Sequence, residues 1–203
     1  MVLLRLAFAL AVGLGASVAS AETPALAVAR ATIVSVSSDG AALSVKTRAG
    51  EPETIRLGPK TRMILVVPAA LADVKPGAFI GVAAVPGEGG ALNAMEVHIF
   101  PEAMRGAGEG FRKFDLGPNS SMTNGAVEAR VNGAVGQTLT VTYKGGQKTI
   151  NVPPGTPIVG FENGDRSELK PGAAIIARGS KTPGGSIDAA AVLIGKDGLV
   201  PPM

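Results

Sequence analysis

The chain contains a single histidine, His98, and no cysteine, so a metal or catalytic site has few strong ligands to draw on. Glu96 stands two residues before His98, which places both side chains on one face if the segment is a strand. Three more carboxylates follow, at Glu102, Glu109 and Asp115. Imidazole and carboxylate groups can together bind a divalent cation, but a zinc site normally uses three or four protein ligands. A divalent-cation-binding accessory protein using His98 and nearby carboxylates is therefore an alternative hypothesis, not the leading one.

The residue types give little support to catalysis. A Ser-His-Asp triad would need His98 as its base, and no serine stands in a G-x-S-x-G turn. The glycine-rich stretch Gly106–Gly110 lacks the Gly-Lys-Ser/Thr ending of a phosphate-binding loop, and no helix pattern follows it. We therefore expect a protein that is not an enzyme and that needs no cofactor.

The stretch from residue 101 to residue 125 has the most distinctive composition in the chain. It follows Phe100, contains two further phenylalanines, and mixes charges of both signs. Because exposed aromatic side chains are adhesive, a bare linker would hardly carry them. Two interpretations stay open: the stretch packs between the two halves of the chain, or it binds a ligand or partner. The residues expected at such a contact are Glu102, Arg105, Gly106, Gly108, Glu109, Gly110, Phe111, Phe114 and Asp115.

Residues 1–21 have the pattern of a secretory signal peptide. Arg5 supplies the positive charge, Leu6–Leu14 is an apolar run, and Ala19-Ser20-Ala21 ends the stretch with small residues. This apolar run is shorter than the roughly 20 residues of a spanning helix, although an uncleaved anchor is the alternative. The absence of cysteine suits an oxidising compartment. We predict a periplasmic or secreted protein that is not an integral membrane protein after signal cleavage.

The charge pattern bears on the partners. The chain has 19 Lys and Arg against 16 Asp and Glu, a formal net charge of +3, and no Lys/Arg run exceeds two residues. Nucleic-acid binding needs clustered positive charge, so no nucleic acid is expected. The expected partner is an unknown protein or a small ligand, and the oligomeric state is left open.

The chain also repeats itself at an offset of 95 residues. Val74–Ala78 (VKPGA) aligns with Leu169–Ala173 (LKPGA), and Gly89-Gly90 aligns with Gly184-Gly185. Shared turn residues in one constant register indicate an internal duplication. The expected division is a signal peptide at 1–21, a first β-barrel repeat at 29–100, an inter-repeat segment at 101–125, a second β-barrel repeat at 126–196 and a C-terminal tail at 197–203.

Within each repeat, short β-type runs alternate with turn signals. Gly58-Pro59, for example, separates Thr54–Leu57 from Arg62–Val67. Roughly five or six short strands per repeat, without a long amphipathic helix, favour a small antiparallel barrel of the oligonucleotide/oligosaccharide-binding (OB) type. The predicted fold is all-β: two small OB-like antiparallel β-barrels in tandem, joined by an ordered Gly-rich segment. A single sandwich of about ten strands is the alternative.

The strand and turn pattern resembles DUF5666, a family of unknown function. The residues that carry the resemblance are Leu139-Thr140-Val141, Thr156-Pro157-Ile158, Leu169-Lys170-Pro171-Gly172 and Ala189. The central stretch is similar to a group of secreted proteobacterial proteins of this type, which often carry His and Trp where this chain has Phe111 and Phe114. The resemblance implies tandem copies of one β-domain outside the cytoplasm. The missing histidine weakens a metal site carried over from that group.

Overall fold

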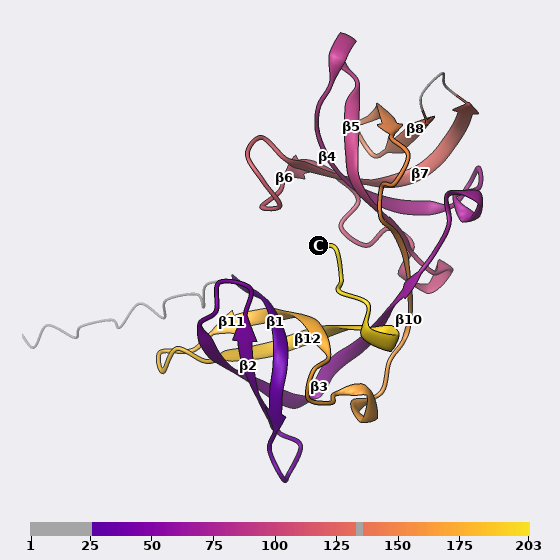
Figure 1. The fold of residues 1–203 in the computed structure, drawn as a ribbon. Helices are drawn as coiled ribbons and strands as arrows, with labels where there is room; N and C mark the ends of the chain where they lie inside the picture. The colour runs from indigo at the N-terminus through magenta and orange to yellow at the C-terminus, as the bar shows by residue number, and fades with distance from the viewer. Residues whose placement is uncertain (1–25, 133–135) are drawn as a thin grey trace, which may run out of the picture.

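A computed structural model describes residues 26–132 and 136–203, so the expected signal peptide at 1–21 lies outside the described residues. Within these residues the fold is all-β, as predicted, and the helical parts are five short 3-10 turns (Figure 1). The strands are β1 Leu26–Val36, β2 Ala42–Thr47, β3 Pro52–Pro68, β4 Phe79–Pro86, β5 Leu92–Ile99, β6 Gly110–Lys113, β7 Ser121–Asn132, β8 Gln137–Tyr143, β9 Gly146–Val152, β10 Ile158–Asn163, β11 Ala174–Lys181 and β12 Ile187–Gly195. The 3-10 turns are η1 Leu71–Asp73, η2 Glu88–Gly90, η3 Glu102–Met104, η4 Arg166–Glu168 and η5 Lys196–Gly198.

The order of elements recurs at the offset seen in the sequence. β1 begins at Leu26 and β7 at Ser121, 95 residues later, and the same spacing relates β4 to β11 and β5 to β12. The repeated Lys-Pro-Gly turn has one geometry in both copies. Gly77 and Gly172 have φ of 82° and 88°, which is the left-handed region that glycine adopts without strain. The repeated sequence therefore encodes a repeated chain path.

One element departs from the predicted pattern. The expected break at Gly58-Pro59 does not end a strand, because β3 runs without interruption through 17 residues. The hydroxyl of Thr61 accepts a hydrogen bond from the N–H of Gly58 at 2.9 Å and donates to the carbonyl of Ala189 at 2.6 Å. These bonds satisfy backbone groups where the ladder between β12 and β3 shifts register, and the strand continues beyond the irregularity.

The first group of strands is a closed five-stranded barrel. Its order is β12-β11-β1-β2-β3, and β12 pairs with β3 in parallel to close the ring. Alternate residues of a strand point to opposite faces, as in β2, where Leu43 and Val45 are fully buried and Ser44 and Lys46 are exposed. The interior is aliphatic, with Ile33, Ile55 and Ile194 among its largest residues.

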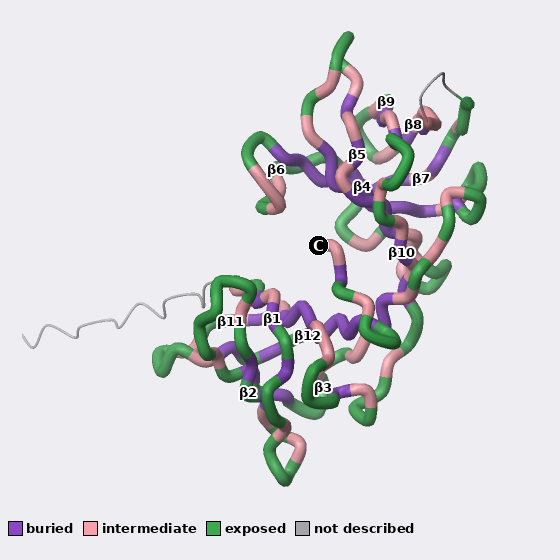
Figure 2. Tube along the Cα trace, in the orientation of Figure 1, coloured by how far each residue is buried: buried purple, intermediate pink, exposed green. Residues whose placement is uncertain are grey.

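The second group has the strand order β5-β4-β7-β8-β9, and β6 pairs with β7 beside it. β9 returns to β5 through a short parallel pairing of Leu92 with Ile150 and Asn93 with Asn151. Its own aliphatic core contains Ile80, Val97 and Leu139. Figure 2 shows buried residues along the strands of both groups.

The prediction that each repeat forms its own barrel, in tandem, is wrong about which strands pair. β1–β3 of the first repeat are completed by β11 and β12 of the second, whereas β4 and β5 of the first repeat join β7, β8 and β9 of the second. The physical reason lies in β3, which is long enough to carry the chain out of the first group before β4 begins. The last two strands of each repeat, β4 and β5 or β11 and β12, then complete the group that the other repeat begins, because equivalent strands present equivalent faces.

The two repeats meet where β3 and β10 run antiparallel between the groups (Figure 1). Val66 lies opposite Phe161 in this ladder, and these two residues occupy the same position in the two repeats, 95 apart. An approximate two-fold axis therefore passes through this pair. A third apolar cluster surrounds the axis and includes Val66, Phe161, Leu193 and Met203.

Candidate functional site

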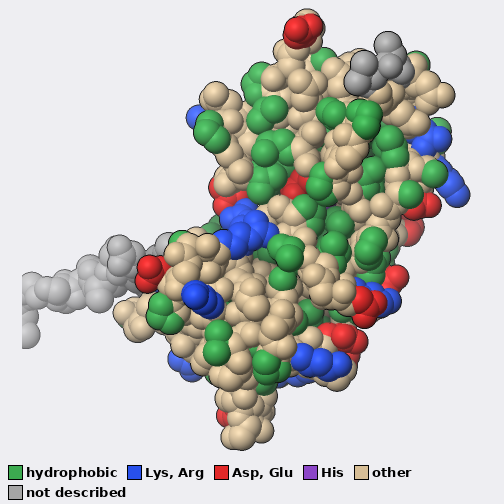
Figure 3. Space-filling view, viewed as in Figure 1, with side chains coloured by type: hydrophobic (Ala, Val, Ile, Leu, Met, Phe, Trp, Pro, Cys, Tyr) green, Lys and Arg blue, Asp and Glu red, His purple; other side chains and the backbone are tan. Residues whose placement is uncertain are grey.

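A cleft of about 190 Å³ lies at this junction of the two strand groups. Its lining residues come from both groups, from the inter-repeat segment and from the last residue, Met203. On the face shown in Figure 3, Lys and Arg side chains gather where the upper and lower groups meet. The cleft combines an apolar wall, buried polar groups and three arginines, and each part has a separate structural origin.

The apolar wall consists of aromatic rings in contact. Phe100 follows β5 and Phe161 lies in the middle of β10, with ring centroids 5.2 Å apart and their planes inclined by 62°. Phe79 packs against Phe100 at 5.5 Å, and the His98 ring lies 5.7 Å from Phe161. Phe100 and Phe161 form an edge-to-face pair, and the other two pairs are tilted, which are arrangements that aromatic rings favour.

Two buried ionisable side chains come from β5. Glu96 and His98 alternate with Val97, which points into the core of the second group, so the two polar residues face the axis. Glu96 is 1% exposed and His98 is 2% exposed, and Glu96 Oε1 lies 2.9 Å from His98 Nε2. The pair is ionic only when the imidazole is protonated. Neither carboxylate oxygen of Glu96, nor Nε2 of His98, has a well-aligned hydrogen bond.

Asn124 on β7 presents a third buried polar group to the cleft. Its amide Nδ2 donates to the carbonyl of Ala107 at 2.9 Å, whereas its Oδ1 is buried without a partner. Gly81 on β4 makes room for this side chain, since a Cβ at Gly81 would lie 2.8 Å from Asn124 Oδ1 and 3.0 Å from the Phe100 ring. The position of Asn124 therefore depends on a glycine in the neighbouring strand.

Arg178 on β11 is the most deeply placed cation of the cleft. Its Nη2 donates to Sδ of Met203 at 3.5 Å, and its Nε is buried without a partner. Burial lowers the pKa of Arg178, and the positive charges of Arg30 and Arg112 lower this pKa further. Guanidinium groups stay charged in proteins, so Arg178 is a partly buried positive charge whose burial outweighs the favourable charges of Asp115 and Glu96.

An ion pair ties the inter-repeat segment to the first group beside the cleft. Arg30 on β1 donates to both carboxylate oxygens of Asp115, at 2.8 and 3.0 Å. The hydrogen bonds from Arg30 hold the pKa of the Asp115 carboxyl below its usual value. Asp115 is therefore engaged by Arg30, and its negative charge offsets the burial of Arg178 only in part.

No protein-family model, curated protein or solved structure matches this chain. The resemblance to DUF5666 stays a prediction that depends on the motifs quoted above. The function must accordingly be argued from the geometry of the chain itself.

Some of the predicted contact residues do gather at the cleft. Gly108 and Phe114 line it, and Asp115 stands beside it through Arg30. Gly108 contributes its backbone, since its carbonyl accepts from Arg112 Nη1 at 2.7 Å. Met104, Ala107 and Arg112 of the same segment also line the cleft.

Other predicted contact residues point elsewhere. Glu102 and Arg105 pair with each other, and Arg105 also donates to the carbonyl of Gly77 on the second group. Glu109 accepts from the backbone N–H of Lys144 at 2.9 Å. Phe111 is 45% exposed and lies under the ammonium of Lys148, 4.3 Å from the ring centroid. Gly106 in a turn and Gly110 at the start of β6 have φ of 84° and 125°, a backbone conformation that glycine adopts at low cost.

The carboxylates of the metal hypothesis do not converge. Over residues 26–132 and 136–203, no group of three or more His, Asp and Glu side chains could hold a metal ion. Glu102, Glu109 and Asp115 each have the other partners described above, so only Glu96 and His98 come together.

Sequence reasoning missed several side chains of the cleft, namely Arg62, Arg178, Met122, Asn124, Phe161 and Met203. The sequence held a signal for Arg178, because it is the charge in the middle of the apolar strand AIIARGSK, whose other charge, Lys181, stands at the end. It held no comparable signal for the others, whose proximity depends on the strand exchange between repeats.

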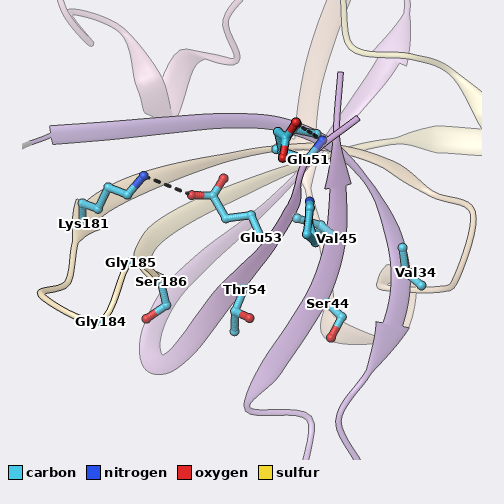
Figure 4. Close-up of a pocket in the computed structure, with 12 residues that line it drawn as sticks. Val34, Ser44, Val45, Glu51, Glu53, Thr54, Lys181, Gly184, Gly185 and Ser186 are labelled. Atoms are coloured by element: carbon cyan, nitrogen blue, oxygen red, sulfur yellow. Dashed lines mark hydrogen bonds and ion pairs between the residues drawn. The ribbon is translucent and has the colours of Figure 1, made fainter. Parts of the chain in front are cut away.

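A wider hollow of about 660 Å³ lies on the first group, between β1, β2, β3 and the β11–β12 hairpin. Figure 4 shows Lys181 reaching toward Glu53 across this hollow, with an N–O distance of 3.6 Å. Among the described residues, those that line this hollow include none with a buried polar atom that lacks a hydrogen-bond partner. We therefore place the candidate site in the smaller cleft.

No helix within the described part of the chain has the length and apolar character needed to cross a membrane.

Proposed function

We propose that this protein is a non-enzymatic, extracytoplasmic binding module whose ligand occupies the cleft at the junction of the two strand groups. One observation carries the proposal: Asn124 Oδ1 and Arg178 Nε are buried without hydrogen-bond partners, and both side chains line this cleft next to the buried Glu96–His98 pair. A buried polar group without a partner costs about 1–3 kcal/mol. A ligand that supplied the missing partners would recover this cost.

The internal repeat shows that the fold does not need these polar groups. The positions that correspond to Glu96 and His98 in the second repeat are Ala191 and Leu193, both buried. The positions that correspond to Asn124 and Arg178 are Ala29 and Ala83, also buried. Because apolar residues fill the same places in the other half, the polar residues on this side are better explained by binding than by folding.

The geometry does not favour catalysis. A nucleophile must lie within hydrogen-bond reach of its base, and Nε2 of His98 has no hydroxyl partner. The divalent-cation alternative has no specific observation in its favour either, since Glu96 and His98 supply two ligands and three arginines line the same cleft.

The proposal of an extracytoplasmic site comes from the signal-peptide pattern of residues 1–21.

His98 provides the test, because it is the only histidine in the chain and faces the cleft. Its ring signals can be followed by ¹H–¹⁵N NMR during titration with benzoate, benzyl alcohol and benzylamine, which share one ring and differ in charge. We expect at least one of the three to shift the His98 signals and to saturate at one molecule per chain. If none of the three shifts these signals at millimolar concentration, the cleft is not a binding site and the proposal fails.

A further inference from the structure

We infer that the cleft selects a small organic anion with an apolar or aromatic body, and that Arg178 supplies the principal contact to its negative group. This inference rests on the proposed function, because it names the class of ligand for the same cleft.

The charge of the cleft points to an anion. Three guanidiniums line it, from Arg62, Arg112 and Arg178, whereas no carboxylate does among the described lining residues. The two nearby carboxylates are held by other groups, Glu96 beside His98 and Asp115 by Arg30. An anion that enters therefore meets three guanidiniums and no carboxylate among the lining residues.

Of the three arginines, Arg178 is the best placed to bind the negative group of the ligand. Removing a charge from water without a counter-ion costs several kcal/mol. The present contact of Arg178 in the cleft is the thioether of Met203, a weak acceptor, and its Nε is unpartnered. The fork of guanidinium N–H groups matches a carboxylate or sulfonate, which accepts two parallel hydrogen bonds. If such a pair of oxygens replaced the thioether, it would accept hydrogen bonds from both Nε and Nη2 of Arg178.

The remaining walls select the body of the ligand. Phe100, Phe114 and Phe161 line the cleft together with Met104 and Met122, surfaces that favour apolar or aromatic groups. A volume of about 190 Å³ lies below the range of roughly 300–1,000 Å³ that drug-sized ligands need, so a single ring fits better than a larger molecule. The methionines could suit a soft metal cation, but three guanidiniums on the same cleft would repel it.

The asymmetry of the two repeats supports Arg178 in particular. Its counterpart, Ala83, is fully buried in the second group, so a small apolar residue suffices for the strand at this position. An arginine there costs folding free energy, and anion binding gives a reason for keeping it.

Isothermal titration calorimetry with benzoate, benzyl alcohol and benzylamine tests the inference, with inorganic phosphate as a probe of the same charge sign without an apolar body. A hydrogen bond to a charged group contributes about 1.5–3 kcal/mol, so benzoate should bind about tenfold or more tightly than benzyl alcohol. Benzylamine and phosphate should bind more weakly than benzoate. Arg178→Gln should bring benzoate down to the affinity of benzyl alcohol and leave benzyl alcohol unchanged.

The matched control is Arg56→Gln, which removes an exposed arginine paired with Asp188 on the first group, outside the cleft lining. This variant should keep the preference for benzoate. Should Arg178→Gln fail to fold, Arg62→Gln at the exposed rim of the cleft provides the second measurement, and it should weaken benzoate alone.

The outcomes separate the inference from the proposed function. Equal affinity for benzoate and benzyl alcohol, or a preference for benzoate that survives both Arg178→Gln and Arg62→Gln, overturns the inference and leaves a binding cleft. Binding of phosphate as tight as that of benzoate also overturns it, because the apolar walls would then contribute nothing. If none of the probes binds or shifts the His98 signals, the inference and the proposed function fail together.

Discussion

Arg30 and Asp115 join parts of the chain that are 85 residues apart, with guanidinium-to-carboxylate distances of 2.8 and 3.0 Å. Arg30 lies on β1 of the barrel, and Asp115 lies in the inter-repeat segment beyond β6. This bidentate pair holds the segment against the first strand group beside the cleft. The arginine is mostly buried, and the carboxylate is 59% exposed.

The stability contributed by this pair should depend on pH. The pKa of Asp115 is lowered in the folded protein, chiefly by the hydrogen bonds from Arg30. Its contribution is therefore complete above the ordinary aspartate pKa near 4 and is lost as the pH falls through the lowered value. We expect Asp115→Asn to reduce the free energy of unfolding by less than about 1 kcal/mol at pH 7, since the pair is partly exposed, and by less at pH 3. Urea unfolding at both pH values measures this difference.

The matched control for Asp115 is Asp188→Asn, which breaks an exposed pair with Arg56 inside the first group at 3.3 Å. Its effect at pH 7 should be the smaller of the two. An Asp115→Asn variant whose loss of stability is the same at pH 7 and pH 3 would contradict the assigned ion pair.

The exchange of strands between repeats predicts which fragments of the chain can fold by themselves. Residues 70–158 contain β4 through β9 and the whole aliphatic core of the second group, so this fragment should fold by itself. Residues 29–100 form one complete sequence repeat, but five strands that pair with theirs lie outside the fragment, namely β7, β9, β10, β11 and β12. This second fragment should remain unfolded, as judged by circular dichroism and NMR dispersion. A cooperative thermal transition in monomeric 29–100 would show that a repeat can complete its own barrel.

The two phenylalanines of the inter-repeat segment should differ in their effect on stability. Phe114 is half-buried and lines the cleft, so Phe114→Ala should lower the free energy of unfolding by about 1–3 kcal/mol, less than for a fully buried ring. Phe111 is 45% exposed and contacts the ammonium of Lys148, so Phe111→Ala should cost roughly 0.5–1 kcal/mol. Thermal unfolding by calorimetry compares the two. Equal and negligible effects would mean that the segment does not dock on the strand groups.

Much of the local structure could be predicted from particular residues. The alternation of Leu43 and Val45 with polar neighbours predicted the strand β2, and both residues are fully buried. The repeated Lys-Pro-Gly turns were also recognisable, because proline and glycine at adjacent positions restrict the backbone to a few turn types. The break expected at Gly58-Pro59 was wrong, because the hydrogen bonds of Thr61 carry the strand past it.

The candidate site was predicted only in part, and for a definite reason. Phe114 and Gly108 were identified as possible contacts and do line the cleft, and His98, considered as a metal ligand, lines it as well. Arg178 and Phe161 lie in the second repeat, and nothing in the linear sequence relates them to His98. They meet only because β10 pairs with both β3 and β5.

The sequence by itself determined the strands, the turns and the register of the internal repeat, because side-chain alternation and turn residues act over a few neighbouring positions. The tertiary structure alone decided which strands close together, since both copies present equivalent edges and local preferences cannot choose between them. That choice places His98 of one repeat and Arg178 of the other at a common cleft.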